Sequence, residues 1–166
     1  MASRDERREW RSAELSLTCW SDPAAALVIA EATAVLPNGR ISPECPGMWS
    51  DAQRDAWAPI VDFIKGQGAR AGIQLAHAGR KASTLAPWVN RSIYKPHLED
   101  EVARAGAGGW EDNLWAPSAL SYNDALPTPA EMSLEDIEVF KCAWRDAVRR
   151  CDEAVSSLFR IHSVRC

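Results

Sequence analysis

The stretch from Gln74 to Lys81, Gln-Leu-Ala-His-Ala-Gly-Arg-Lys, carries the side chains of this sequence that are best suited to chemistry. The amide of Gln74 presents a donor and an acceptor side by side, which matches the paired carbonyl and N–H edge of a flavin pyrimidine ring. His77, Arg80 and Lys81 add polar and cationic groups that suit an electron-rich ring or an anionic substrate. The alternative is a polar loop after a buried strand, in which His77 satisfies backbone groups.

Two short apolar runs predict the strands that would position this stretch. Residues 27–32 form a run that is apolar on both faces, as in a strand buried in a parallel sheet, and residues 69–75 predict a second buried strand. Between them, Ser50 and Gln53 form a capping box that starts a helix, and the helix stops near Gly66. Its buried face is expected to consist of Trp57, Ile60, Val61 and Ile64. Strand, helix and strand joined by short turns make a βαβ unit.

The rest of the chain predicts a long connection, a second helix and a third strand. Residues 76–132 show no strong periodicity, and a connection of this length inside a compact domain is normally functional or disordered. Ser133 starts the helix, with Asp136 as a weaker capping partner. Its apolar stripe is expected to consist of Ile137, Phe140, Trp144, Ala147, Val148 and Cys151. Residues 158–161 predict the third strand.

This order predicts an α/β fold with about three parallel strands, helices and a long loop after the second strand. A Rossmann-type sheet and a barrel are both compatible with the pattern, but no glycine-rich dinucleotide or phosphate loop follows any strand. A barrel places its chemistry at the carboxyl ends of its strands. Those ends are expected at Glu31–Ala32, at Gln74–Lys81 and at His162.

Tryptophan is unusually frequent, with eight residues in the chain. Trp49, Trp88, Trp110 and Trp115 lie in segments rich in Pro, Gly and Ser. Large aromatic side chains in loops either pack back on the body of the protein or line a pocket.

The stretch Gln74–Lys81 resembles the signature that follows the third barrel strand in bacterial-type Old Yellow Enzymes, the NADH:flavin oxidoreductases. Other motifs resemble the same family in the same order along the chain: Glu31–Val35 with Asn38–Ile41, Gly47–Asp51, Ala116–Ala119 and Thr128–Met132. The resemblance runs from about Ala26 to Ala154 and continues more weakly to His162.

The resemblance implies a (β/α)₈ barrel that binds FMN and reduces activated alkenes with NAD(P)H. By position in the motifs, the backbone of Ala32 would lie near the flavin ring and Gln74 would bond its pyrimidine edge. Lys81 would lie on the substrate side. His162 matches the first of two histidines that hold the substrate's carbonyl or nitro oxygen, so that the alkene accepts hydride more readily.

The sequence departs from the family at both ends. The second histidine, expected three residues after His162, is replaced by Arg165, which cannot release a proton near neutral pH, and no tyrosine follows as proton donor. Residues 1–22 do not match the family's first strand, and strands five to eight have no counterpart. We therefore expect an unmatched charged segment over 1–22 and a partial barrel, about strands two to four, over 23–166, with activity impaired by truncation.

Composition sets further limits on partners and location. The net charge of −4 favours neither nucleic acid nor an anionic membrane as partner, and no apolar run is long enough to span a membrane. The charged N-terminus lacks a signal-peptide core, so a cytoplasmic location is expected. Five cysteines without a CxxC pair are expected to be free thiols, and no metal site is expected.

Two functions therefore compete. The first is an FMN-binding oxidoreductase that passes hydride from NAD(P)H to an activated alkene or enone. The second is a non-catalytic barrel fragment or interaction module without flavin, which acts through exposed sheet edges. A homo-oligomer or a complementing fragment is the expected protein partner.

Overall fold

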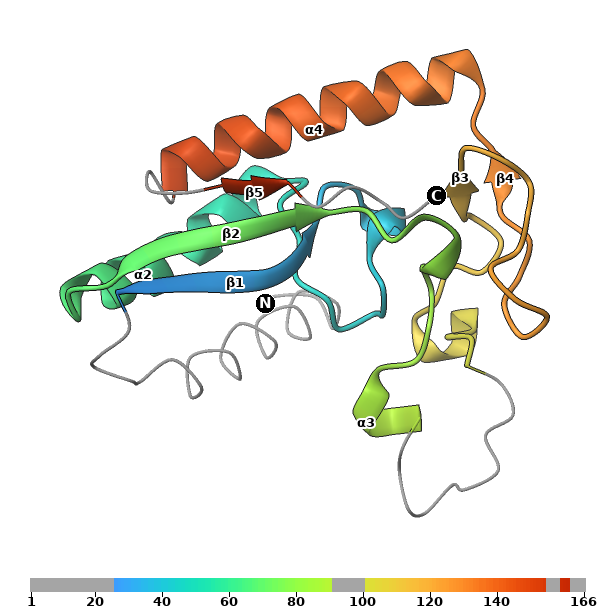
Figure 1. Cartoon of the computed structure of the whole chain (residues 1–166), viewed down its shortest axis with the longest axis horizontal. Helices are drawn as coiled ribbons and strands as arrows, with labels where there is room; N and C mark the ends of the chain where they lie inside the picture. The colour runs from blue at the N-terminus through green and yellow to red at the C-terminus, as the bar shows by residue number, and fades with distance from the viewer. Residues whose placement is uncertain (1–25, 91–100, 155–158, 162–166) are drawn as a thin grey trace.

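The computed structural model describes residues 26–90, 101–154 and 159–161. Its centre is a parallel sheet of three strands in the order β1-β2-β5, formed by Leu27–Ala34, Arg70–Ala76 and Phe159–Ile161. Helix α2, Asp51–Gly66, connects β1 to β2, and helix α4, Leu134–Ala154, precedes β5 (Figure 1). The predicted order of strands, helices and long connection is confirmed.

Both long helices pack on the same face of the sheet. Along β1 and β2, every second side chain enters this core, because successive residues of a strand point to opposite faces. The core is formed by Val28, Ala30, Ala71, Ile73 and Leu75 from the strands, by Trp57, Ile60, Val61 and Ile64 from α2, and by Ala147 and Cys151 from α4, together with Val35 and Met48. The predicted buried face of α2 is therefore confirmed.

Both helices begin with the side-chain hydrogen bonds expected from the sequence. The side-chain oxygen of Gln53 accepts the backbone N–H groups of Trp49 and Ser50 at 2.9 and 3.0 Å. At the start of α4, the backbone N–H of Ser133 donates to the carboxylate of Asp136 at 2.9 Å, and the backbone N–H of Asp136 donates to the Ser133 hydroxyl at 3.1 Å. These bonds satisfy donors that would otherwise have no partner within the helix.

Ion pairs across the helix–helix contact join α2 to α4. Arg150 donates to the carboxylate of Asp51 at 2.7 Å, and Arg54 donates to Glu153 at 2.8 Å. In both pairs the partners are 99 residues apart in the chain.

The apolar stripe predicted for α4 is correct in its second half and wrong at Ile137. Ala147 and Cys151 are fully buried, and Trp144 and Val148 pack against the core, but Ile137 is 38% exposed. The first turns of α4 extend past the end of the three-stranded sheet toward β4, so the sheet does not cover this side chain (Figure 1).

The long connection contains short regular elements that its sequence did not predict. Trp115–Ala116 and Ala130–Glu131 pair in parallel as β3 and β4, and Pro87–Asn90 forms the short helix α3. Gly79–Lys81 forms a 3₁₀ helix directly after β2. Figure 1 shows β3 and β4 beyond the carboxyl ends of β1 and β2.

A bulge at Glu31 fixes how the carboxyl halves of β1 and β2 face each other. Ala30 pairs with Ile73 and Ala32 with Gln74, so Glu31 has no partner in the ladder. After the bulge, Thr33 takes the core position opposite Leu75, and both side chains are fully buried. The Thr33 hydroxyl donates to the carbonyl of Glu31 at 2.9 Å, which gives the extra residue a hydrogen bond that the ladder does not supply.

Replacing this hydroxyl should weaken the fold without changing the shape of the side chain. We expect Thr33→Val to lower the free energy of unfolding by about 1 kcal/mol or more, since a buried hydrogen bond is lost in a β-branched residue of similar size. Urea denaturation monitored by circular dichroism measures the change. Thr128→Val, at an exposed position, should change stability by less than about 0.5 kcal/mol, and equal effects of the two variants would contradict the proposed role of the hydroxyl.

Candidate active site

Ala32 and Gln74, the two residues predicted to contact a flavin, lie next to each other on the sheet. They are Cα partners in the pairing of β1 with β2, and both are half-buried. They belong to the face of the sheet that points away from α2 and α4, which we call the open face. Its other members in β1 and β2 include Leu27, Ile29 and Gly72, and Leu27 and Ile29 are 40% and 38% exposed.

The side-chain amide of Gln74 is available to a ligand. Within residues 26–90, 101–154 and 159–161, it makes no hydrogen bond, although its side chain stands on a strand inside the sheet. The carboxamide can therefore offer its donor and its acceptor together to one partner. Ala32 beside it carries only a methyl group and Gly72 no side chain, and small residues allow a flat molecule to approach the backbone closely.

His77 is buried among protein groups and does not face the open sheet. Its ring is 4% exposed, and its Nδ1 accepts the backbone N–H of Gly79 at 3.1 Å. The ring contacts Phe140 of α4 edge to face, with centroids 5.2 Å apart. Burial lowers the pKa of His77 to about 4, so the ring is neutral at physiological pH and carries its proton on Nε2. That atom has no hydrogen-bond partner among the described residues.

The environment of His77 supports the structural alternative for this residue. The ring sets the turn after β2 and packs against the loop after β1. In that loop, the carbonyl of Gly39 accepts the backbone N–H of Ala78 at 2.8 Å. A Cβ atom at Gly39 would lie 2.4 Å from the His77 ring, so only glycine allows this close approach.

Arg80 and Lys81 point to the long connection that covers the carboxyl ends of the strands. Arg80 donates to the hydroxyl of Ser118 at 3.1 Å. The Lys81 ammonium lies 3.7 Å from the centre of the Tyr122 ring. Lys81 and Tyr122 line a cavity of about 300 Å³, whose other residues include Ile41, Thr84, Leu85 and Glu101. Neither Ala32 nor Gln74 lines this cavity. The structure thus brings Ala32 and Gln74 together on the sheet and places Lys81 at a cavity that neither of them lines.

His162 lies outside the described residues, as does Arg165, so the role predicted for His162 stays a prediction. Ile161, its neighbour in sequence, is the last residue of β5 and pairs with Leu75 of β2. Arg160 pairs with Gln74.

Arg40 holds the loop after β1 against the long connection, a role that sequence reasoning missed. Its guanidinium lies 4.4 Å from the ring centre of Trp110 and 5.4 Å from that of Trp49. The indole N–H of Trp110 donates to the carbonyl of Asn38 at 3.0 Å. The abundance of tryptophan in loops was the available signal. Trp49 and Trp110 pack back on the protein, whereas Trp88 is 65% exposed.

Two further properties concern the described part of the chain only. None of its helices has the length and apolar character needed to cross a membrane. Its His, Cys, Asp and Glu side chains form no group of three that could hold a metal ion.

Comparison with known proteins identifies relatives along most of the chain. The model of the NADH:flavin oxidoreductase / NADH oxidase family matches residues 18–166. An NADH:flavin oxidoreductase of Gibberella zeae is 36% identical over 156 residues, which cover 93% of this chain and 35% of that protein. The NADPH dehydrogenase of Bacillus subtilis is 34% identical over 137 residues, covering 82% of this chain and 33% of that protein.

Solved structures show the same fold. Morphinone reductase matches with a TM-score of 0.65 at 24% identity, over 92% of this chain and 38% of its own. Old Yellow Enzyme from Pichia matches with a TM-score of 0.64 at 24% identity, over 88% of this chain and 36% of its own. These neighbours are (β/α) barrels, so the sheet is part of a barrel and not of a Rossmann-type fold. The chain spans about a third of the length of the curated relatives it matches.

The contact between Gly39 and His77 can be tested by adding one methyl group. We expect Gly39→Ala to destabilise the fold by about 1–3 kcal/mol, because the ring behind it is buried and has little room to move. Gly66→Ala is the matched control: nothing lies within 4 Å of a Cβ there, and the position ends α2, so alanine should be neutral or stabilising. Thermal unfolding of both variants measures the difference, and a neutral Gly39→Ala would show that the two loops are not tightly packed.

Buried, neutral His77 should make stability depend on pH. The pKa of His77 falls from its ordinary 6.5 to about 4 on folding, so the unfolded chain binds the proton more readily between these values. The contribution of neutral His77 to the free energy of unfolding should therefore be fully present above pH 6.5. It should fall by up to about 3 kcal/mol as the pH drops to 4. The carboxylates of Asp51, Asp136 and Glu153 have lowered pKa values, and they lose their contributions at lower pH. Urea denaturation at several pH values should show a flatter profile for His77→Gln; an unchanged profile would refute the assignment.

Proposed function

The chain belongs to the NADH:flavin oxidoreductase / NADH oxidase family, and from this membership we propose that it supplies the pyrimidine-recognising edge of an FMN-dependent oxidoreductase. The reaction is hydride transfer from NAD(P)H to an activated alkene or enone, a small-molecule substrate. Bound FMN would supply the chemistry of accepting and passing on the hydride. The residues of this chain would hold the ring and the substrate in place.

The observation that carries the proposal is the free amide of Gln74 beside Ala32. The two residues pair across the carboxyl halves of adjacent parallel strands, on the open face, and the amide makes no other hydrogen bond among the described residues. In barrels of this kind the chemistry lies at the carboxyl ends of the strands. Gln74 would donate to and accept from the pyrimidine edge, and the backbone of Ala32 would lie against the ring.

Lys81 and His162 would act on the substrate side. A lysine ammonium and a histidine N–H are both donors, and donors aimed at a carbonyl or nitro oxygen draw electron density from the conjugated alkene. In the structure the ammonium of Lys81 contacts the Tyr122 ring. This contact leaves the other donors of the ammonium group available, so Lys81 can remain on Tyr122 while it meets an anionic or carbonyl oxygen.

A second function, an interaction module without flavin, is favoured by one observation on the same face. Leu27 and Ile29 expose 40% and 38% of their surface on the open face, where in a closed barrel they would face other strands. A second copy of this chain or a complementing fragment that adds strands would bury them. Sedimentation and flavin titration separate the two functions, since only the first requires binding of FMN.

The flavin proposal is tested by replacing the amide of Gln74 with an apolar group of similar size. We expect Gln74→Leu to weaken binding of FMN by about tenfold or more, because two hydrogen bonds to the ring are lost. Titration of FMN at high micromolar protein, followed by quenching of flavin fluorescence, measures the affinity.

The control is Gln67→Leu, the same change at an exposed position after α2, which should bind FMN like the unmodified chain. Equal affinities for the two variants would remove Gln74 from the site. Failure of the unmodified chain to bind FMN, alone or as an oligomer, would favour the interaction module.

A further inference from the structure

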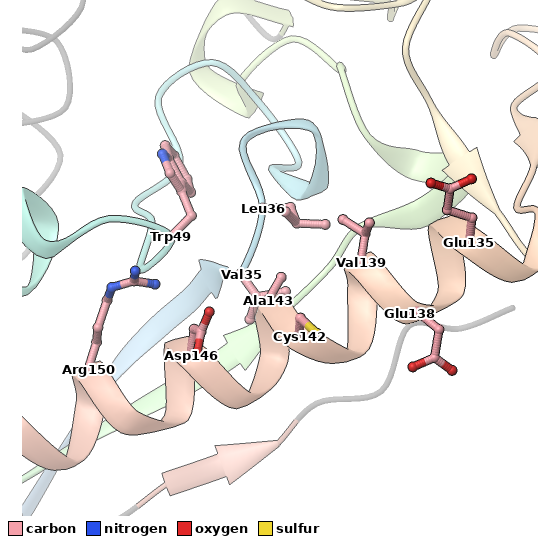
Figure 2. Close-up of a pocket in the computed structure, with 10 residues that line it drawn as sticks. All are labelled: Val35, Leu36, Trp49, Glu135, Glu138, Val139, Cys142, Ala143, Asp146 and Arg150. Atoms are coloured by element: carbon pink, nitrogen blue, oxygen red, sulfur yellow. The ribbon is translucent and has the colours of Figure 1, made fainter.

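Two cavities of the structure differ in whether their cationic and aromatic groups already have partners. The larger, of about 460 Å³, lies along α4, and Figure 2 shows the side chains that line it. There Arg150 donates to the carboxylate of Asp51 at 2.7 Å, and the ring centre of Trp49 lies 5.4 Å from the Arg40 guanidinium. The cation and the ring of this cavity are therefore satisfied within the protein, and neither indicates a ligand.

The smaller cavity, of about 300 Å³, has a cation without an acceptor. Lys81 lines it, and its ammonium forms no hydrogen bond or ion pair among residues 26–90, 101–154 and 159–161. Glu101 lines the same cavity, but within that part of the chain its carboxylate is not paired with Lys81. The ammonium instead contacts the ring of Tyr122, whose centre lies 3.7 Å from the nitrogen.

The backbone that follows Lys81 is fixed in a strained conformation. Ser83 is fully buried and has a φ of 57°, a left-handed conformation that residues other than glycine seldom adopt. Its hydroxyl donates to the carbonyl of Ala103 and accepts the backbone N–H of Trp110, both at 2.8 Å. Strain held in place by such contacts is common at functional sites. Because the backbone is fixed, the remaining freedom of the ammonium lies in the torsions of its own long side chain.

We propose that Tyr122 is a positioning residue for Lys81, and that its ring holds the ammonium at this cavity with its N–H donors available to a substrate oxygen. A ring suits this role better than a carboxylate, because it restrains the cation without neutralising its charge. The inference rests on the substrate-side role proposed above for Lys81 and adds the partner that would orient it. Tyr122 is 53% exposed, so its replacement should leave the fold intact.

The contact can be tested without flavin. The ring of Tyr122 shields the Lys81 nitrogen, so Tyr122→Leu should speed acylation of Lys81 by an uncharged reagent such as acetic anhydride. We expect a change of about two- to fivefold, which corresponds to the loss of an exposed cation–π contact. Peptide mass spectrometry measures the rate at Lys81, with Lys141, which pairs with Glu138 on the surface, as the internal reference. Tyr122→Phe keeps the ring and should retain the shielding.

A double-mutant cycle tests whether Tyr122 acts through Lys81 in the proposed reaction. The quantity measured is kcat/KM for reduction of cyclohexenone by NADPH with the FMN-loaded protein. We expect Tyr122→Leu to lower kcat/KM by about two- to fivefold when Lys81 is present, and to have no further effect in a Lys81→Met background. Phe63→Leu is the matched control, because this ring is 49% exposed and lies on α2; it should change neither kcat/KM nor acylation of Lys81.

The outcomes separate this inference from the proposed function. An unchanged acylation rate at Lys81 in Tyr122→Leu would overturn the positioning role, whether or not FMN binds. So would a loss of kcat/KM that is equally large in the Lys81→Met background or in Tyr122→Phe. If the unmodified chain binds no FMN, the proposed function fails, and the acylation rates alone decide whether Tyr122 holds Lys81.

Discussion

The arrangement of the candidate site depends on the bulge at Glu31. In a regular parallel pair, Glu31 would face Gln74, and Ala32 would enter the core opposite Leu75, because side chains alternate between faces. After the extra residue, the alternation of side chains between the two faces is shifted by one position. Ala32 therefore stands beside Gln74, and Thr33 is buried instead. The bulge thus puts Ala32, and not Glu31, at the position paired with Gln74; a carboxylate at that position would compete for the amide's donor and repel an electron-rich ring. Bulges are common next to active sites for this reason: they re-aim side chains.

The carboxyl ends of β1 and β2 are then covered by loops held through specific contacts. Arg40 lies between the rings of Trp49 and Trp110, Trp110 donates to the carbonyl of Asn38, and Arg80 donates to Ser118. The contacts of Trp110 with Arg40 and Asn38 join the long connection to the loop after β1, whereas the contacts of Arg40 with Trp49 and of Arg80 with Ser118 each join two parts of one connection. Cation–π contacts and hydrogen bonds to backbone carbonyls both depend on geometry, so together they fix the long connection in one position. The motifs that carry the family resemblance supply most of the residues in these contacts, so they help to hold the loops in place.

The sequence predicted what depends on local pattern and failed where distant residues meet. The three strands, the buried face of α2 and both helix starts follow from spacing within one segment, and the structure has them where predicted. The bulge leaves no mark in the alternation of Leu27 to Ala34, since almost every residue there is apolar. The contact of Arg150 with Asp51 spans 99 residues, and Ile137 is exposed because α4 is longer than the sheet beneath it. The family resemblance predicted that Ala32 and Gln74 both lie near the flavin. The periodicity alone was compatible with both a Rossmann-type sheet and a barrel.

Recognition by Gln74 and coverage of the open face are physically linked. A half-exposed amide already bonds to water, so exchanging water for a ligand gains little unless the new bonds are shielded. The side chains that would provide shielding on this face, Leu27 and Ile29, are themselves exposed among the described residues. A flat ring over Ala32 would leave Leu27 and Ile29, in the amino-terminal half of β1, in water. Additional strands that bury Leu27 and Ile29 would lower the local dielectric around Gln74 and strengthen its hydrogen bonds to the ring. Binding of flavin and association of the sheet with further strands should therefore reinforce each other.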